Sequence, residues 1–92
     1  MNIKQIKYFV SVANRGSLSS AAREHGISVQ AVSKSMADLE SEFGENLFDR
    51  SHQGIELTPL GEAFLEKAAE VDSSFRELEL ISESCDEKPV KL

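Results

Sequence analysis

Apolar residues recur at helical spacing in the stretch 27–43, ISVQAVSKSMADLESEF. This spacing predicts a helix over residues 28–43 with one buried stripe. The residues of that stripe are Val29, Val32, Met36, Leu39 and Phe43. Ser28 is suited to cap the helix, because its hydroxyl can accept a hydrogen bond from a backbone N–H one turn further on. The other side carries no acid before Asp38, so its first turns suit a negatively charged partner, and we expect this helix to enter a groove of DNA.

Two shorter helices are predicted before it, over residues 3–14 and 18–25. Asn2 is suited to cap the first helix and Ser17 the second, and Gly16 and Gly26 follow their ends. The residues expected to face inward are Ile3, Ile6, Phe9, Val10 and Ala13 in the first helix, and Leu18, Ala21 and Ala22 in the second. A tight turn with Gly26 joins the second helix to the helix over 28–43, which is a helix-turn-helix pattern. Helical hairpins with glycine turns also occur in proteins that bind no DNA, so the segments that follow decide its meaning.

A β-hairpin is predicted next, with strands over residues 47–50 and 55–57 around a turn at 51–54. The residues expected to face the core are Leu47, Phe48, Ile55 and Leu57. A hairpin directly after the second helix of a helix-turn-helix is the wing of a winged helix-turn-helix.

A longer helix is predicted from Thr58-Pro59 to about Ser84, with the threonine as cap and the proline at the first helical position. Its apolar residues follow a spacing close to a heptad repeat: Leu60, Phe64, Ala68, Val71, Phe75 and Leu78. One small domain offers too little surface to cover such a stripe, so we expect a second copy of the chain to cover it. Residues 85–92 show no periodicity and are expected to form a flexible tail.

Together these elements predict a mainly α fold. A winged helix-turn-helix of three helices and a two-stranded wing, residues 1–57, precedes a long linker and dimerisation helix, residues 58–84, and the tail, residues 85–92. A chain of 92 residues is near the lower end of what one hydrophobic core supports.

The net charge of −6 is unevenly distributed along the sequence. Residues 1–37 hold five basic residues against one acid, whereas residues 38–92 hold five basic residues against fifteen acids. Two halves of opposite charge fit a protein that presents one face to a polyanion. No apolar run approaches the roughly 20 residues of a membrane span, and no signal-peptide pattern opens the chain. We therefore expect a cytoplasmic protein without a membrane partner.

The sequence contains no catalytic constellation and no glycine-rich phosphate loop. Cys85 is the only cysteine, which excludes an internal disulfide and a multi-cysteine metal site. His25 and His52 are the only histidines, and no acid cluster frames either of them. We expect no enzymatic activity, no cofactor and no metal.

Taken in order, a set of residues resembles the N-terminal DNA-binding domain of LysR-type transcriptional regulators. The set comprises Phe9-Val10, Gly16-Ser17, Ala21-Ala22, Ser28, Ser33, Leu39-Glu40, Leu47-Phe48-Asp49-Arg50, Leu57-Thr58-Pro59 and Gly61. Its most specific part is L-F-D-R followed by L-T-P-x-G, and the resemblance extends from Met1 to about Ser84. It implies a linker helix that pairs with the linker helix of a second subunit, and binding to a partly palindromic promoter site.

The resemblance implies double-stranded DNA and a second copy of the chain as partners. Helix 28–43 would lie in the major groove, and wing 51–54 on the flanking groove or backbone. The expected DNA-binding residues are Ser28, Val29, Gln30, Ser33, Lys34, Arg50 and Gln53, and the expected dimer interface is Phe64, Ala68, Val71, Phe75 and Leu78. For Phe64 and Phe75, a place in the core is the alternative to the dimer interface. Val29 stands where glutamine is usual in the family and offers only apolar contact, for instance with a thymine methyl group. Gln53 stands where a basic residue is common.

Two interpretations of Arg50 and two functions remain open. Arg50 contacts a phosphate or pairs with a nearby acid such as Asp49 or Glu56. The first function is a homodimeric, sequence-specific DNA-binding domain, which could assemble further in a full-length protein. The second, motivated by the overall acidity and the missing basic residue of the wing, is a winged-helix protein-interaction module with little DNA affinity. We expect a fragment of a longer regulator, and a small-molecule effector only if a further C-terminal domain exists.

Overall fold

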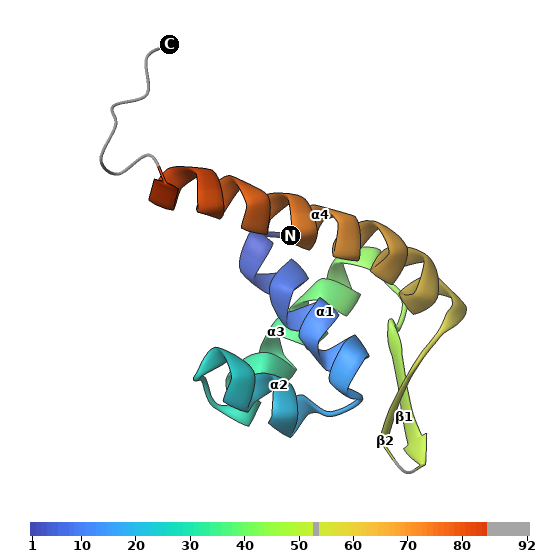
Figure 1. Ribbon diagram of the computed structural model, residues 1–92. Helices are drawn as coiled ribbons and strands as arrows, with labels where there is room; N and C mark the ends of the chain where they lie inside the picture. The colour runs from blue at the N-terminus through green and yellow to red at the C-terminus, as the bar shows by residue number, and fades with distance from the viewer. Residues whose placement is uncertain (53, 85–92) are drawn as a thin grey trace.

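The first three helices of the computed structural model, which describes residues 1–52 and 54–84, contain the predicted helix-turn-helix. Helix α1 spans Ile3–Arg15, α2 spans Leu18–His25 and α3 spans Val29–Phe43. Helix α1 lies in the middle, with α2 and α3 on one side and α4 on the other (Figure 1).

The turn between α2 and α3 is closed by backbone hydrogen bonds and a serine cap. Gly26 has a φ angle of 66°, a left-handed conformation that residues with a side chain disfavour. The N–H of Ile27 donates to the carbonyl of Ala22 over 3.0 Å. The hydroxyl oxygen of Ser28 accepts a hydrogen bond from the N–H of Ala31 over 3.1 Å. These contacts fix the angle at which α3 follows α2.

The wing is an antiparallel pair of strands, β1 (Phe48–His52) and β2 (Gly54–Leu57). Phe48 pairs with Leu57 at the base of the wing, and the register becomes irregular toward the tip. Both strands extend into the predicted turn, and Gln53 between them lies outside the described residues.

Helix α4 spans Pro59–Ser84 and packs along α1 (Figure 1). The hydroxyl of Thr58 accepts a hydrogen bond from the N–H of Gly61 over 3.0 Å and donates one to the carbonyl of Asn46 over 2.7 Å. A Cβ atom at Gly61 would lie 2.1 Å from the carbonyl oxygen of Leu47. Glycine therefore lets the start of α4 approach the base of the wing closely.

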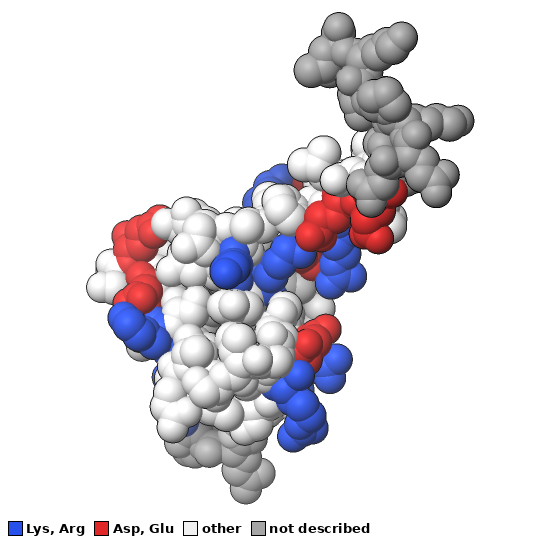
Figure 2. All heavy atoms as spheres, turned by 90° about the vertical axis from the view of Figure 1, so that its left-hand side faces the viewer, with Lys and Arg blue, Asp and Glu red and all other residues white. Residues whose placement is uncertain are grey.

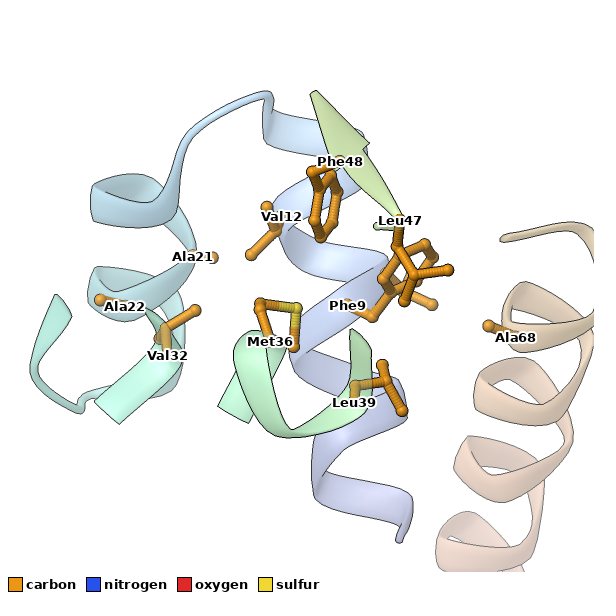
Figure 3. Packing of buried hydrophobic residues seen from close by; sticks show 11 residues of the cluster. Phe9, Val12, Ala21, Ala22, Val32, Met36, Leu39, Leu47, Phe48 and Ala68 are labelled. Carbon is orange, nitrogen blue, oxygen red and sulfur yellow. The ribbon is translucent and has the colours of Figure 1, made fainter. Parts of the chain in front are cut away.

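The hydrophobic core lies between α1, α2, α3 and β1, and α4 closes one side of it (Figure 3). Its largest fully buried side chains are Phe9, Met36, Leu39, Leu47, Val12 and Val32. The ring of Phe9 is central, because its centroid lies 5.1 Å from that of Phe48 and 4.8 Å from that of Phe64. Wing, linker helix and helix-turn-helix thus share one core, which fixes how α3 is presented.

The predicted fold class is confirmed for the described residues, which form a mainly helical winged helix-turn-helix with a two-stranded wing and a long last helix. The predicted buried stripe of α3 is wrong at both ends. Its three middle residues are fully buried, whereas Val29 is 41% exposed and Phe43 is 38% exposed. These are the first and last residues of the helix, where neighbouring elements cover less of it than at its middle. The predicted tail, residues 85–92, lies outside the described residues.

Candidate nucleic-acid interface

The outward face of α3 brings five of the predicted DNA-binding residues together. These residues are Ser28, Val29, Gln30, Ser33 and Lys34. Ser33 is half-buried and the other four are exposed. At 100° per residue, the four that belong to the helix fall within an arc of about 140°. They form one continuous surface at the N-terminal end of α3, while Val32 and Met36 anchor the other side in the core.

The N-terminus of α3 is itself a favourable site for an anion. Ser28 caps the N–H of Ala31, and the N–H groups of Val29 and Gln30 have no preceding helical turn to which they could donate. The first turn contains no acid. Free N–H groups and the positive end of the helix dipole together attract a phosphate group.

Lys34 supplies a positive charge to this face and has a partner on its own helix. Its ammonium group lies 3.3 Å from the carboxylate of Asp38, and the two side chains are 78% and 54% exposed. An exposed pair of this spacing contributes only about 0.3–0.5 kcal/mol. A phosphate or a guanine can therefore compete with Asp38 for the ammonium group.

Glu40 holds the wing against α3. One oxygen of its carboxylate accepts hydrogen bonds from the backbone N–H groups of Leu47, over 2.8 Å, and Phe48, over 3.2 Å. The other oxygen lies 3.9 Å from the guanidinium of Arg50. Arg50 therefore pairs with an acid of α3, yet its side chain remains 42% exposed. Gln53, the other predicted wing contact, lies outside the described residues.

The separation of charge along the sequence is only partly a separation in space. Figure 2 shows basic and acidic side chains in mixed groups around a largely uncharged surface. On α1, the Nε atom of Arg15 lies 2.9 Å from the carboxylate of Glu24, which also accepts a hydrogen bond from the hydroxyl of Ser11. The hydrogen bond from Ser11 and then that from Arg15 hold the pKa of Glu24 below its ordinary value.

Among the described residues, Lys4 and Arg23 take part in no ion pair.

The domain itself covers part of the apolar stripe of α4. Ala68 is 3% exposed, and the ring of Phe64 lies 4.8 Å from that of Phe9 and 5.2 Å from that of Phe43. The expectation that a second copy covers the whole stripe is therefore wrong for this part of α4, which is covered within the same chain. The flank of α4 that contains Phe64 and Ala68 faces the hydrophobic core of the domain, where Phe64 contacts Phe9 of α1 and Phe43 of α3.

The other three residues predicted for the dimer interface remain at the surface. Val71 is 43% exposed, Leu78 is 59% exposed and Phe75 is half-buried. With Glu70 and Ser74 they line a shallow, mainly apolar hollow on the side of α4.

Further along α4, the face that lies on α1 becomes polar. Asp72 is only 6% exposed, with one carboxylate oxygen 3.7 Å from the Nζ atom of Lys7 and the other 3.1 Å from Arg76. The same Nζ atom lies 3.4 Å from the carboxylate of Glu79 and 4.9 Å from the ring centroid of Phe75.

Glu40 and Asp72 are not among the site residues predicted from the sequence. Glu40 follows the buried Leu39 and so lies at the edge of the stripe, where a carboxylate can reach the next element. Asp72 follows Ala68 by four residues and therefore shares its buried face. An acid on the buried face of a helix indicates a cation on the neighbouring element, and this signal was available in the sequence.

Within residues 1–52 and 54–84, no three or more His, Cys, Asp or Glu side chains are grouped to hold a metal ion. The helices of these two ranges lack the combined length and apolar character needed to cross a membrane.

Comparison with known proteins points to one family. The family pattern described as "Bacterial regulatory helix-turn-helix protein, lysR family" matches residues 3–62. The HTH-type transcriptional regulator TcbR of Pseudomonas sp. (strain P51) is 42% identical over 71 residues, 77% of this chain and 24% of TcbR. This chain thus spans about a quarter of the length of the curated relatives it matches first.

Solved structures with the same architecture include complexes with DNA. The crystal structure of the CbnR_DBD–DNA complex has a TM-score of 0.72 and 41% sequence identity, covering 95% of this chain and 93% of that chain. The BenM_DBD/catB site 1 DNA complex has a TM-score of 0.86 and 24% identity, covering 99% of this chain and 100% of that chain, and supports the fold alone.

Proposed function

This chain belongs to the lysR family of bacterial regulatory helix-turn-helix proteins, and we propose that it binds promoter DNA as a homodimer. The family consists of transcriptional regulators and not of enzymes. In this proposal residues 1–57 form the DNA-binding domain and residues 58–84 the linker helix. Helix α3 enters the major groove, and the wing contacts the flanking groove or backbone. The protein then acts in the cytoplasm, where the bacterial chromosome lies.

The observation that carries the proposal is the outward face of α3. Its first turns contain no acid, and free backbone N–H groups lie at its N-terminal end. Ser28 directs those groups toward a phosphate, which sets the position of the helix on the duplex. Gln30 and Ser33 present hydrogen-bonding groups to base edges, and Val29 presents an apolar surface to a thymine methyl group. In support, CbnR, whose DNA-binding domain is 41% identical, was crystallised on DNA.

Further contacts are assigned to charged and wing residues. Lys34 leaves Asp38 for a phosphate or a guanine. Arg50, on the exposed side of β1, contacts the backbone while Glu40 keeps the wing in place. Gln53 is assigned to the flanking groove on its sequence position alone. These assignments predict that most affinity comes from phosphate contacts and most selectivity from α3.

The dimer is assigned to the distal part of α4. Val71 and Leu78 are large apolar side chains with 43% and 59% of their surface exposed. They flank Phe75 around the shallow hollow, so the same hollow on a second copy can take up these side chains. Phe64 and Ala68 are left out of the proposed interface because Ala68 belongs to the core of the domain and Phe64 packs against that core. A higher oligomer, or a small-molecule effector, is proposed only for a protein with a further C-terminal domain.

The experiment that tests the proposal is an electrophoretic mobility shift with DNA from upstream of the protein's own gene, at two salt concentrations. We expect a specific shift whose affinity falls steeply with salt, with a slope of about −0.9 for each phosphate neutralised. If a folded and dimeric protein gives no shift even at low salt, the proposal fails. The winged-helix protein-interaction module, which the net charge of −6 motivates, then becomes the better description.

Two isosteric variants make the shift assay specific to α3. Gln30→Glu places a negative charge on the proposed DNA face without changing the shape of the side chain, and should weaken binding strongly. Gln5→Glu makes the same change near the start of α1. That end of α1 is remote from Ser28, since the amino group of Met1 lies 2.6 Å from Glu42, near the other end of α3. Equal losses in both variants would contradict the assignment of α3 as the reading helix.

A further inference from the structure

We propose that Lys7 fixes the direction of the distal half of α4, residues 72–84, relative to the helix-turn-helix, and so sets the spacing of the two α3 helices in the dimer. The part about spacing rests on the proposed function, whereas the part about the direction of α4 does not.

The contact between α4 and the rest of the domain changes character along the helix. Its first turns are held by apolar packing, in which Leu60, Phe64, Leu65 and Ala68 join the core. The same face of α4 continues with Asp72, Phe75 and Glu79. These residues follow Ala68 at steps of four, three and four residues. Two carboxylates and one aromatic ring therefore take the place of apolar side chains on this face where the distal half begins.

Lys7 is the α1 residue on which these three side chains converge. Its Nζ atom lies 3.7 Å from Asp72, 3.4 Å from Glu79 and 4.9 Å from the centroid of the Phe75 ring. The side chain of Lys7 is only 22% exposed and that of Asp72 only 8%, so solvent and salt screen this pair less than a surface pair. Arg76 also neutralises Asp72, but it belongs to α4 and cannot tie α4 to α1.

Asp72 makes this contact necessary. The Oδ1 atom of Asp72 is buried and accepts no hydrogen bond from the described residues. It faces Lys7 and borders a hollow of about 250 Å³ between α1, α2 and α4, lined also by Asn14 and His25. Removal of the Lys7 charge therefore leaves this buried carboxylate oxygen without its cation from α1.

The consequence for the dimer follows from the position of the proposed interface. Val71 directly precedes the distal half, and Phe75 and Leu78 lie within it. The ring of Phe75 lies below Lys7 and also lines the shallow apolar hollow of the proposed interface. A change in the direction of this segment therefore moves the partner as a whole. The separation of the two recognition helices decides which half-site spacing a dimer accepts. Lys7 is thus a positioning residue for spacing and touches no DNA itself.

The direction of α4 is tested without DNA by distance measurements between spin labels on the full chain, in a Cys85→Ser background. One label replaces the exposed Ser19 on α2 and the other replaces Glu83 on the distal half, and labelled chains are diluted with unlabelled ones to isolate distances within a protomer. Lys7→Met keeps the aliphatic stem and removes the charge. We expect the single narrow distance of the parent to be lost and replaced by a broad distribution.

Three comparisons keep this test specific. Lys7→Arg retains the charge and should retain the narrow distance. Lys4→Met removes a charge from the same helix that takes part in no ion pair among the described residues, and should change nothing. A label at Glu66, on the proximal half, should give an unchanged distance to Ser19 in Lys7→Met. An unchanged distal distance in Lys7→Met, with the protein folded, overturns the proposal.

The spacing is then tested by selecting bound DNA from a random library with the parent protein and presenting the selected half-sites at varied separations. We expect the parent to prefer one separation and Lys7→Met to accept neighbouring separations with similar affinity, with the same half-site sequence. An unchanged spacing preference overturns the link to DNA. If the parent selects no DNA, the proposed function fails, and the label distances alone still decide whether Lys7 directs α4.

Discussion

The carboxylate of Glu40 accepts a hydrogen bond from the backbone N–H of Leu47 over 2.8 Å, across the junction between α3 and the wing. The same carboxylate accepts from Phe48 and lies beside Arg50. One side chain of α3 thus satisfies two backbone N–H groups at the point where the chain turns into β1. The position of the wing relative to α3 is therefore set by a charge-assisted contact as well as by the core.

Removal of the Glu40 carboxylate should destabilise the domain and loosen the wing. In Glu40→Ala, two partly buried N–H groups lose their acceptor, which should lower the free energy of unfolding by about 2 kcal/mol or more. Glu40→Gln keeps an acceptor oxygen, so its free energy of unfolding should fall by less. Urea unfolding measures the stability, and amide exchange at Leu47 and Phe48 reports the wing. Glu45→Ala removes an exposed acid nearby and should leave both unchanged; a loss as large as that in Glu40→Ala would refute the role given to Glu40.

Substitution of Gly61 should be strongly destabilising although it lies in a helix. Alanine normally stabilises a helix interior relative to glycine by about 1 kcal/mol. Here the added Cβ would meet the carbonyl oxygen of Leu47 at 2.1 Å, and a backbone oxygen cannot rotate away. We expect Gly61→Ala to lower the free energy of unfolding by about 2 kcal/mol or more. Ser73→Ala, at an exposed position of α4, is the control and should be nearly neutral in the same thermal unfolding experiment.

The order of elements was predictable because capping residues and periodicity act locally. Asn2, Ser17 and Ser28 each accept a hydrogen bond from the first turn of the helix they precede, as their positions in the sequence predicted. The outward face of α3 followed from the same pattern, because a buried stripe defines the opposite side. The exposure of the end residues Val29 and Phe43 could not be predicted in this way, because it depends on how far neighbouring elements extend.

The pairing of charged residues was not predictable because it depends on contacts between elements. Net charge along the sequence suggested a basic half, but Lys7 meets Asp72 and Glu79 only once α4 folds back on α1. In the same way Arg50 pairs with Glu40, an acid 10 residues away on α3. Periodicity also could not divide the stripe of α4 between the core and the surface, because that division depends on which elements pack against the helix.

The depressed pKa of Glu24 should make part of the stability depend on pH. Because the hydrogen bonds from Ser11 and Arg15 favour the ionised form, the folded-state pKa lies below the ordinary value of 4.5. The contribution is therefore present above the ordinary pKa and is lost as the pH falls through the lowered one. In Ser11→Ala, the pKa of Glu24 measured by NMR titration should rise toward its ordinary value. The stability difference from the parent should shrink on acidification, and a difference that grows instead would contradict this cause.

Charge changes at Lys34 and Asp38 should alter DNA binding in opposite directions. Lys34→Ala removes a cation from the proposed interface and should reduce the magnitude of the salt slope by about 1 if it contacts a phosphate. If it reads a guanine instead, preference at one base pair should relax. Asp38→Asn releases Lys34 from its partner 3.3 Å away and should strengthen binding to specific and unrelated DNA. Fluorescence anisotropy at several salt concentrations measures both variants, and unchanged binding in both would exclude Lys34 from the interface.

A charge at Leu78 should separate the proposed dimer without unfolding the protomer. Leu78 is 59% exposed in the single chain, so a glutamate at this position is hydrated in the monomer. When the hollows of two copies meet, the glutamate must lose its water and lies near acidic residues such as Glu70 of the other copy. We expect Leu78→Glu to sediment as a folded monomer and to lose most of its affinity for a two-half-site DNA. Ser73→Glu adds the same charge on another side of α4 and should leave the dimer intact. Phe75→Glu tests the interface less cleanly, because the Phe75 ring also lies below Lys7. A dimeric Leu78→Glu would mean that the two copies meet elsewhere, and the apolar hollow on α4 would then need another occupant.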